Sequence, residues 1–232
     1  LGTSALHGAR PTVLRSLCEV MERIAPLRLA GSWDNVGVLL DTWKEEIDLP
    51  ATIFVTNDLT EKTLSEAVSK GASIIVTYHP TPFGKSRRLE RDDPTSRVVL
   101  GCVRHGIAVY SPHTALDCAE NGLNDWLARG CGEGEVKPIQ PDRDNEHAGE
   151  GRVLTLSEPA SVADVVDRVK AHLGLDLVRI SLPTSVLPDT KTTRETAEAA
   201  ARETIVRTIA VCAGSGGSVL EGAKDADLWL TG

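Results

Sequence analysis

Aromatic side chains are scarce in this chain of 232 residues, which has four Trp, two Tyr and two Phe. Its core must therefore be built mainly from aliphatic residues, alanine and cysteine. The five cysteines are an odd number and include no Cys-x-x-Cys pair, which argues against a disulfide framework and favours a reducing compartment. No apolar run approaches the roughly 20 residues that a membrane-spanning helix needs, so we expect no membrane association.

Positive charge is also in short supply, since 25 Lys and Arg stand against 33 Asp and Glu, for a net charge of -8. A face that binds nucleic acid needs clustered positive charge to neutralise phosphates, so a nucleic-acid partner is not expected. The composition predicts a cytoplasmic protein. The chain begins at Leu1 rather than Met, and a mitochondrial location is the alternative if an N-terminal transit peptide was removed.

Three apolar, β-branched runs each end in side chains that suit metal binding or acid–base chemistry. Residues 53–56 lead into Asn57-Asp58, residues 74–77 into Tyr78-His79-Pro80, and residues 107–110 into Ser111-Pro112-His113-Thr114. Helical segments between the runs predict parallel strands. Ligands of open α/β sheets bind outside the carboxyl ends of such strands. We therefore expect the three polar clusters to converge on one pocket.

The order of elements predicts an α/β fold of two related lobes, residues 1–141 and 152–232, with mostly parallel sheets facing a central metal-binding cleft. Residues 132–151 are rich in Gly, Pro, Asp and Glu and are interpreted as a linker. The second lobe is expected to contain strands at 153–156, 177–182, 208–212 and 227–231 and a helix that Ser161 caps. Residues 183–204 fit an exposed helix or a disordered excursion, and we favour partial disorder.

His79 and His113 are the histidines with the clearest placement for chemistry. A neutral imidazole at a strand end can bind zinc, iron or manganese, or it can be a hydrogen-bonded structural residue. His113 and Asp117 lie four positions apart and share one face of a helical turn, where they could chelate a metal or act as an acid–base couple. The alternative is that Thr114 and Asp117 only stabilise the start of that helix.

Three other segments have plainer interpretations. Asp34 and Asn35 are expected to build a turn through bonds from their side chains to the backbone, and Asp58 with Glu61 suggests the start of a helix. The sequence Gly-Ser-Gly-Gly-Ser at 214–218 is either an anion-binding turn or a tight turn that needs positive φ. It matches neither GxGxxG nor a Walker A loop.

Taken together, six motifs resemble the Nif-three-like family (NGG-one-interacting factor three), also known as GTP cyclohydrolase I type 2 homologues. The resemblance covers residues 12–141 and 152–232 and rests on the segments 32–37, 57–60, 78–80, 111–117, 122–127 and 212–216. It implies a two-lobed α/β fold with a dinuclear metal site in the cleft and assembly into a ring-shaped hexamer. Residues 142–151 leave no room for the domain that many members insert there, so this would be a short form.

The same resemblance assigns roles residue by residue. Of two adjacent histidines before the proline in the bacterial pattern, the second matches His79, whereas the first is replaced by Tyr78. The carboxylate ligand matches Asp117, and His113 matches a histidine that lines the site. The remaining ligands, a His and a Glu, would follow Gly232. We therefore expect His79 and Asp117 to hold one or two divalent ions (zinc, iron or manganese), with Tyr78 and His113 orienting water or substrate in catalysis.

Two functions follow from these expectations. The first is a metal-dependent hydrolase that acts on a nucleotide-like or phosphorylated small molecule, and the intact stretch from His113 to Asp117 favours it. The second is a non-catalytic scaffold or regulatory protein that works through protein partners with a degenerate metal site, and Tyr78 favours it. If His79 and Asp117 bind one ion, their side chains should lie within about 6 Å of each other.

Overall fold

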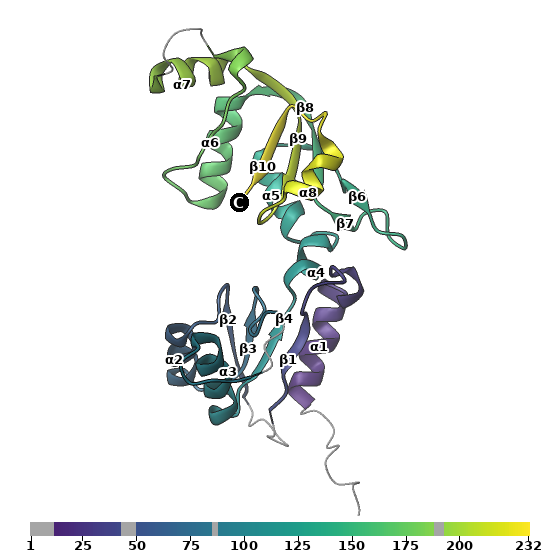
Figure 1. Cartoon of the computed structure of the whole chain (residues 1–232). Coiled ribbons are helices and arrows are strands. Elements are labelled where there is room, and N and C mark those ends of the chain that lie inside the picture. The colour runs from purple at the N-terminus through teal and green to yellow at the C-terminus, as the bar shows by residue number, and fades with distance from the viewer. Residues whose placement is uncertain (1–11, 43–49, 85–87, 188–192) are drawn as a thin grey trace, which may run out of the picture. The chain divides into compact units, whose positions relative to one another are not determined.

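The structure is a computed structural model that describes residues 12–42, 50–84, 88–187 and 193–232. The chain divides into two compact units, Leu1–Leu116 and Asp117–Gly232. Each unit is built around a four-stranded sheet of its own, with helices packed against it (Figure 1).

The sheet of the first unit has the strand order β1-β4-β3-β2. Its strands are β1 (Gly37–Leu40), β2 (Thr52–Thr56), β3 (Ala72–Thr77) and β4 (Ala108–Ser111). Strands β2, β3 and β4 are parallel, and β1 pairs with β4 in the antiparallel sense. The carboxyl ends of β2, β3 and β4 therefore lie at one edge of the sheet, as the sequence predicted.

Helices cover both faces of this sheet (Figure 1). Helix α1 (Thr12–Ile24) lies on one face, where Leu14 packs with Ile74 of β3. Helices α2 (Glu61–Ser69) and α3 (Pro94–His105) lie on the other, where Leu64 and Val98 join the cluster around Ile75. The neighbouring residues Ile74 and Ile75 of β3 thus pack on opposite faces of the sheet, because side chains alternate along a strand. The short helix η1 (Leu27–Leu29) follows α1.

The second unit has the strand order β10-β9-β8-β5. Its strands are β5 (Gly134–Lys137), β8 (Arg152–Ser161), β9 (Ile205–Cys212) and β10 (Leu228–Thr231), and β6 (Gln140–Pro141) and β7 (Gly149–Glu150) form a separate pair. Its helices are α5 (Leu123–Cys131), α6 (Val162–Leu173), α7 (Arg194–Glu203) and α8 (Gly217–Leu220), with short turns η2 (Thr184–Val186) and η3 (Glu221–Ala223). Helix α4 (His113–Cys118) starts directly after β4 and runs across the division between the units.

The second sheet corrects the expectation of mostly parallel strands. Only β9 and β10 run parallel, whereas β8 is antiparallel to both β5 and β9. Residues 132–151, interpreted as a linker, contain β5, β6 and β7, and β5 pairs along β8. The sequence placed the division between units in this segment, but hydrogen bonding of β5 to β8 joins it to the second unit.

Two other segments of the second unit also differ from expectation. Residues 177–182 form no strand, and Leu177 is exposed, because no sheet edge pairs with this apolar segment. Within 183–204, the described residues form η2 and the regular helix α7, which begins with a capping box between Thr193 and Thr196. Residues 188–192 lie outside the described part of the chain.

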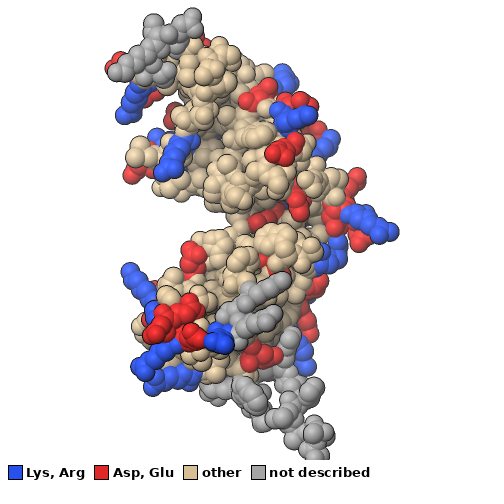
Figure 2. All heavy atoms as spheres, in the orientation of Figure 1, with Lys and Arg blue, Asp and Glu red and all other residues tan. Residues whose placement is uncertain are grey.

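The surface carries charges of both signs. On the face that Figure 2 shows, basic and acidic atoms lie side by side around α2 and α3, where Arg97 pairs with Glu61 at 2.8 Å. No helix among the described residues is both long and apolar enough to span a bilayer.

Candidate functional site

The candidate site lies in the first unit, where β2, β3 and β4 end. The backbone holds these ends in register: the N–H of Tyr78 donates to Thr56 O and the N–H of His79 to Asn57 O, both at 3.0 Å. The Ser111 hydroxyl donates to the carbonyl of Tyr78 at 2.8 Å. The polar clusters that follow three separate strands therefore lie together at this edge, and their convergence on one pocket stays a prediction.

His113 is held by a buried carboxylate from the loop before β1. Its Nδ1 lies 2.8 Å and 2.9 Å from the two carboxylate oxygens of Asp34, whose side chain is fully buried. The hydroxyl and the N–H of Thr114 both donate to Asp34 Oδ2 as well. His113 has φ of 29°, a left-handed value that is rare outside glycine and that concentrates at functional sites.

His79 is held in the same way by a different aspartate. Its Nδ1 lies 2.7 Å from Oδ1 of Asp58, and both side chains are about half exposed. Asp58 was expected to start helix α2, but Thr60 does this through a capping box with Thr63. The carboxylate of Asp58 is therefore left to orient the imidazole of His79.

The two imidazoles and the ring of Tyr78 form one cluster. The ring centres of His79 and His113 are 5.7 Å apart, and the Tyr78 ring lies 4.9 Å from His79 and 5.5 Å from His113. Two exposed aromatic rings, Trp33 and Phe83, contact His113 edge-on at 6.2 Å and 6.1 Å. Five rings thus gather at one point of the unit. Three of them belong to Trp, Tyr and Phe, which are scarce in this chain.

The electrostatics keep both aspartates ionised. Burial raises the pKa of Asp34, but hydrogen bonds from Thr114, His113 and the N–H of Asn35 outweigh burial and hold the pKa below its usual value. The hydrogen bond with His79 lowers the pKa of Asp58. A carboxylate only accepts hydrogen bonds, so the proton of each neutral imidazole sits on Nδ1 and the lone pair on Nε2.

Asp117 lies on α4, four residues after His113, and is the first residue of the second unit. Its carbonyl accepts a hydrogen bond from the side-chain amide of Asn124 at 3.1 Å. The predicted approach of Asp117 to His79 joins residues of different units and stays a prediction. The structure thus brings together Tyr78, His79 and His113 of the four residues named from the sequence.

The glycine-rich turn at 214–218 fits the structural interpretation. Gly214 and Gly216 have φ of 70° and 58°, the left-handed region that glycine enters without strain. The N–H of Gly214 donates to Gly232 O at 3.3 Å, and the N–H of Gly232 donates back at 3.0 Å. The helix that follows, α8, has four residues. This segment is a tight turn that ties the ends of β9 and β10.

Asp34 and Asp58 are the functional residues whose roles sequence reasoning missed. Both lie in segments that stood out, a loop with an unexpected tryptophan and a strand end rich in polar residues. Their partners are 79 and 21 residues away along the chain. Local patterns predict turns and caps, but they do not indicate pairings over such distances.

The imidazole is a suitable ligand for a borderline metal, and the hydrogen bonds found for His79 and His113 within the described residues use Nδ1 and not Nε2. No group of three or more His, Cys, Asp or Glu able to hold a metal ion occurs within the described residues. Fold and site together define an α/β protein with a pair of histidines, each oriented by an aspartate, at the carboxyl edge of a parallel sheet.

Comparison with known proteins assigns the chain to a family. The sequence model of the family described as "Duf34/NIF3 (NGG1p interacting factor 3)" matches residues 12–232. The chain belongs to this family, which confirms the resemblance seen in its motifs.

Individual relatives agree with this assignment. The "Protein NIF3 homolog" of Schizosaccharomyces pombe is 37% identical over 97% of this chain and 77% of its own length. The "NGG1-interacting factor 3" of Saccharomyces cerevisiae is 32% identical over 87% of this chain and 70% of its own length. A solved Bacillus cereus protein related to NIF3 has the same fold, with a TM-score of 0.75 at 17% identity over 94% of this chain and 81% of that one.

Proposed function

We propose that this protein binds a divalent metal ion through Nε2 of His79 and His113 and uses it to hydrolyse a small phosphorylated or nucleotide-like molecule. The observation that carries the proposal is the pair of histidine–aspartate hydrogen bonds, 2.7 Å at His79 and 2.8 Å at His113. Metal-binding histidines characteristically donate their other ring N–H to a carboxylate, which fixes the ring and raises its basicity.

The spacing of the rings supports a shared site. Two imidazoles bound to one ion at about 2.1 Å would have ring centres roughly 5–6 Å apart. The observed separation of 5.7 Å falls in this range. Asp117, which the family resemblance assigns as a ligand, would add a carboxylate from the start of the second unit. Zinc, iron and manganese all accept such a mixed set, and a second ion would need ligands beyond these three.

The residues around the pair suit hydrolysis. A bound divalent ion would lower the pKa of a coordinated water and so provide hydroxide near neutral pH. In this arrangement Asp34 and Asp58 keep the imidazoles oriented, and the ring of Tyr78, against both histidines, limits how a substrate can approach. Trp33 and Phe83 offer exposed aromatic edges beside His113 for the apolar part of a substrate.

Metal content of the purified protein tests the proposal. We expect elemental analysis after dialysis against zinc, manganese or iron(II) to show bound metal in the wild type. His79→Ala and His113→Ala should each lose it, whereas His105→Ala, a change at an exposed histidine of α3, should retain it. Hydrolysis of a chromogenic phosphate ester should follow the metal content. A wild type without metal after reconstitution would contradict the proposal.

A second candidate function, a scaffold that acts through protein partners, is favoured by the edge strand β2. Its Ile53 and Val55 are exposed, at 43% and 73%, on the face opposite the one that α2 and α3 cover. An exposed apolar edge strand invites pairing with another chain. We propose that β2 is a contact surface for a second copy of this chain or a partner protein, in line with the hexamer that the family resemblance implies.

A further inference from the structure

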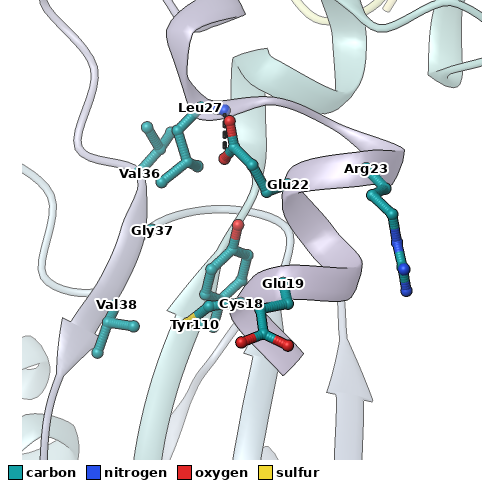
Figure 3. A pocket seen from close by; sticks show the side chains of 9 residues that line it. All are labelled: Cys18, Glu19, Glu22, Arg23, Leu27, Val36, Gly37, Val38 and Tyr110. Atoms are coloured by element: carbon teal, nitrogen blue, oxygen red, sulfur yellow. Dashed lines mark hydrogen bonds between the residues drawn. The ribbon is translucent and has the colours of Figure 1, made fainter. Parts of the chain in front are cut away.

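The first unit contains a cavity of about 660 Å³ that shares no residue with the histidine pair. It lies between α1, η1 and the edge strand β1, and Figure 3 shows its lining side chains. Leu27, Val36 and Val38 form apolar walls, and Tyr110 of β4 lies at its floor. The volume is in the range of pockets that bind small molecules.

The hydroxyl of Tyr110 is a polar group in the lining of this cavity. The residue is 1% exposed, yet its hydroxyl points into the cavity toward Glu22 (Figure 3). Among the described residues no hydrogen bond to this hydroxyl is found, and His172 Nε2 is the buried side-chain polar atom that lacks a partner, so the Tyr110 hydroxyl opens onto the cavity. A tyrosine buries its ring and usually gives its hydroxyl a hydrogen-bond partner. A ligand atom in the cavity would supply that partner.

Carboxylates of α1 give the cavity its charge. Glu22 directs its carboxylate to the mouth, where Oε2 accepts the N–H of Leu27 at 3.2 Å, and Glu19 lies one turn earlier on the same helix. The side chain of Arg23 extends away from Glu22 and Tyr110 (Figure 3). The Glu22 carboxylate therefore lies on the side of the cavity toward which the Tyr110 hydroxyl points, and Arg23, the cation among the lining residues, extends away from both (Figure 3).

We propose that this cavity binds a small organic cation, a protonated amine carried on a hydrocarbon or aromatic body. The ammonium group would donate hydrogen bonds to the Glu22 carboxylate and the Tyr110 oxygen, while the body would pack on Leu27, Val36 and Val38. An anion would be repelled by the Glu22 carboxylate, and a neutral molecule would leave this carboxylate without a charged partner. Burial, with smaller effects of Cys18 and Glu22, raises the pKa of Tyr110 to about 12, so its phenol stays neutral at pH 7.

Three probes of similar shape and different charge test the proposal on the full chain: phenethylammonium, phenylethanol and phenylpropanoate. Titrations followed by amide chemical shifts at one fixed, low ionic strength should show phenethylammonium shifting the signals of α1 and β1. Its affinity should exceed that of the alcohol about fivefold or more, since a carboxylate–ammonium contact in a partly enclosed site is worth on the order of 1 kcal/mol. Phenylpropanoate should bind most weakly.

Variants separate the charge from the packing. Glu22→Gln, an exposed change on α1, should reduce the affinity for phenethylammonium to that of phenylethanol and leave the alcohol unchanged. Tyr110→Phe should weaken both probes. Glu66→Gln, which removes the same charge from exposed α2, should alter neither. Equal binding of the ammonium and the alcohol to the wild type, or shifts confined to other elements, would overturn the proposal.

Discussion

Asp34 shows how one buried side chain can organise a site. Its two oxygens accept hydrogen bonds from Nδ1 of His113, from the N–H and hydroxyl of Thr114 and from the N–H of Asn35. The hydroxyl of Thr114 in turn accepts the N–H of Gly31 at 3.1 Å. The loop before β1 and the start of α4 are thus fixed to each other, and the orientation of His113 depends on both.

Replacing Asp34 by Asn should therefore weaken the proposed metal site. The amide keeps one acceptor oxygen, which can face Thr114, but its NH2 then meets the N–H of Asn35 that Oδ1 accepts now, and Nδ1 of His113 loses a charged partner. We expect metal affinity to fall about 10- to 100-fold and the free energy of unfolding to fall by about 1–3 kcal/mol. Isothermal titration with zinc and chemical denaturation measure the two effects.

Asp58→Asn provides the comparison. Its carboxylate is 61% exposed, so water can replace part of what His79 loses, and stability should change by less than about 0.5 kcal/mol. Metal affinity should still fall, because the orientation of His79 depends on the same contact. Unchanged affinity in both variants would show that the aspartates do not support a metal site.

At the residue scale, the positions of the two histidines could be predicted from the sequence, but the aspartates that orient them could not. His79 and His113 follow strands, and the period of the apolar runs locates strand ends well. Asp34 satisfies the local rule for a turn and Asp58 the local rule for a cap. Their longer-range contacts arise only once β2, β3 and β4 lie side by side.

At the scale of elements, the second unit depends on a buried ion pair at the start of β8. The side chain of Arg152 is fully buried and makes a two-point contact with Asp125 of α5, at 2.7 Å and 2.9 Å. Its remaining donors bond to the carbonyls of Ala119, Gly149 and Gly151. This one guanidinium joins the segments before α5 and after β7 to the sheet.

Removing the carboxylate of this pair should destabilise the second unit strongly. Asp125→Ala leaves the guanidinium of Arg152 buried without its counter-charge, and we expect a loss of about 3–5 kcal/mol in the free energy of unfolding. Asp167→Ala, which removes an exposed carboxylate of α6, should change it by less than about 0.5 kcal/mol. Denaturant unfolding followed by Trp126 and Trp229 fluorescence measures the difference, and equal losses in the two variants would contradict this role.

Asp227, just before β10, makes hydrogen bonds to β9 whose contribution to stability should depend on pH. Asp227 accepts the N–H groups of Arg207 and Thr208 and the Thr208 hydroxyl at 2.8–2.9 Å. Burial raises the pKa of Asp227, but these three hydrogen bonds outweigh burial and lower it overall. A lowered pKa in the folded state means that stability is complete above the unfolded value near 4 and is lost as the pH falls through the folded value.

Asp227→Asn should consequently be less stable than the wild type at pH 7, by about 1 kcal/mol. The difference in the free energy of unfolding should shrink as the pH falls below about 4, because the carboxyl of the wild type then becomes protonated and loses the charge that the variant also lacks. Thermal unfolding of both proteins from pH 7 down to the acid limit of solubility gives the comparison. A difference that is independent of pH would show that the charge of Asp227 is not involved.

Helices and strands could be predicted where the local sequence pattern alone determines them. The apolar run 53–56 lies within β2, and Ser161 caps its helix as expected. The apolar run at 177–182 has the composition of a strand but finds no pairing partner. The polar segment 134–137 lacks that composition and is a strand because β8 offers it a free edge.

At the scale of the whole molecule, the exposed apolar face of β2 predicts self-association. We expect light scattering at micromolar concentration to give a mass above that of the monomer. Val55→Lys should shift the protein toward the monomer, because a charge on an edge strand opposes pairing. Val103→Lys, on an exposed face of α3, should not. A wild type that is monomeric throughout would contradict the prediction.

The central claim is that Nε2 of His79 and Nε2 of His113 bind the same divalent ion, and nitrogen NMR of the imidazole rings tests it most directly. Zinc added to the ¹⁵N-labelled protein should move the Nε2 signals of His79 and His113 together, along one binding curve, while both Nδ1 atoms keep their protons. The Nε2 signal of the exposed His105 should stay in place. Signals of His79 and His113 that do not move, or that move no more than that of His105, would contradict the claim.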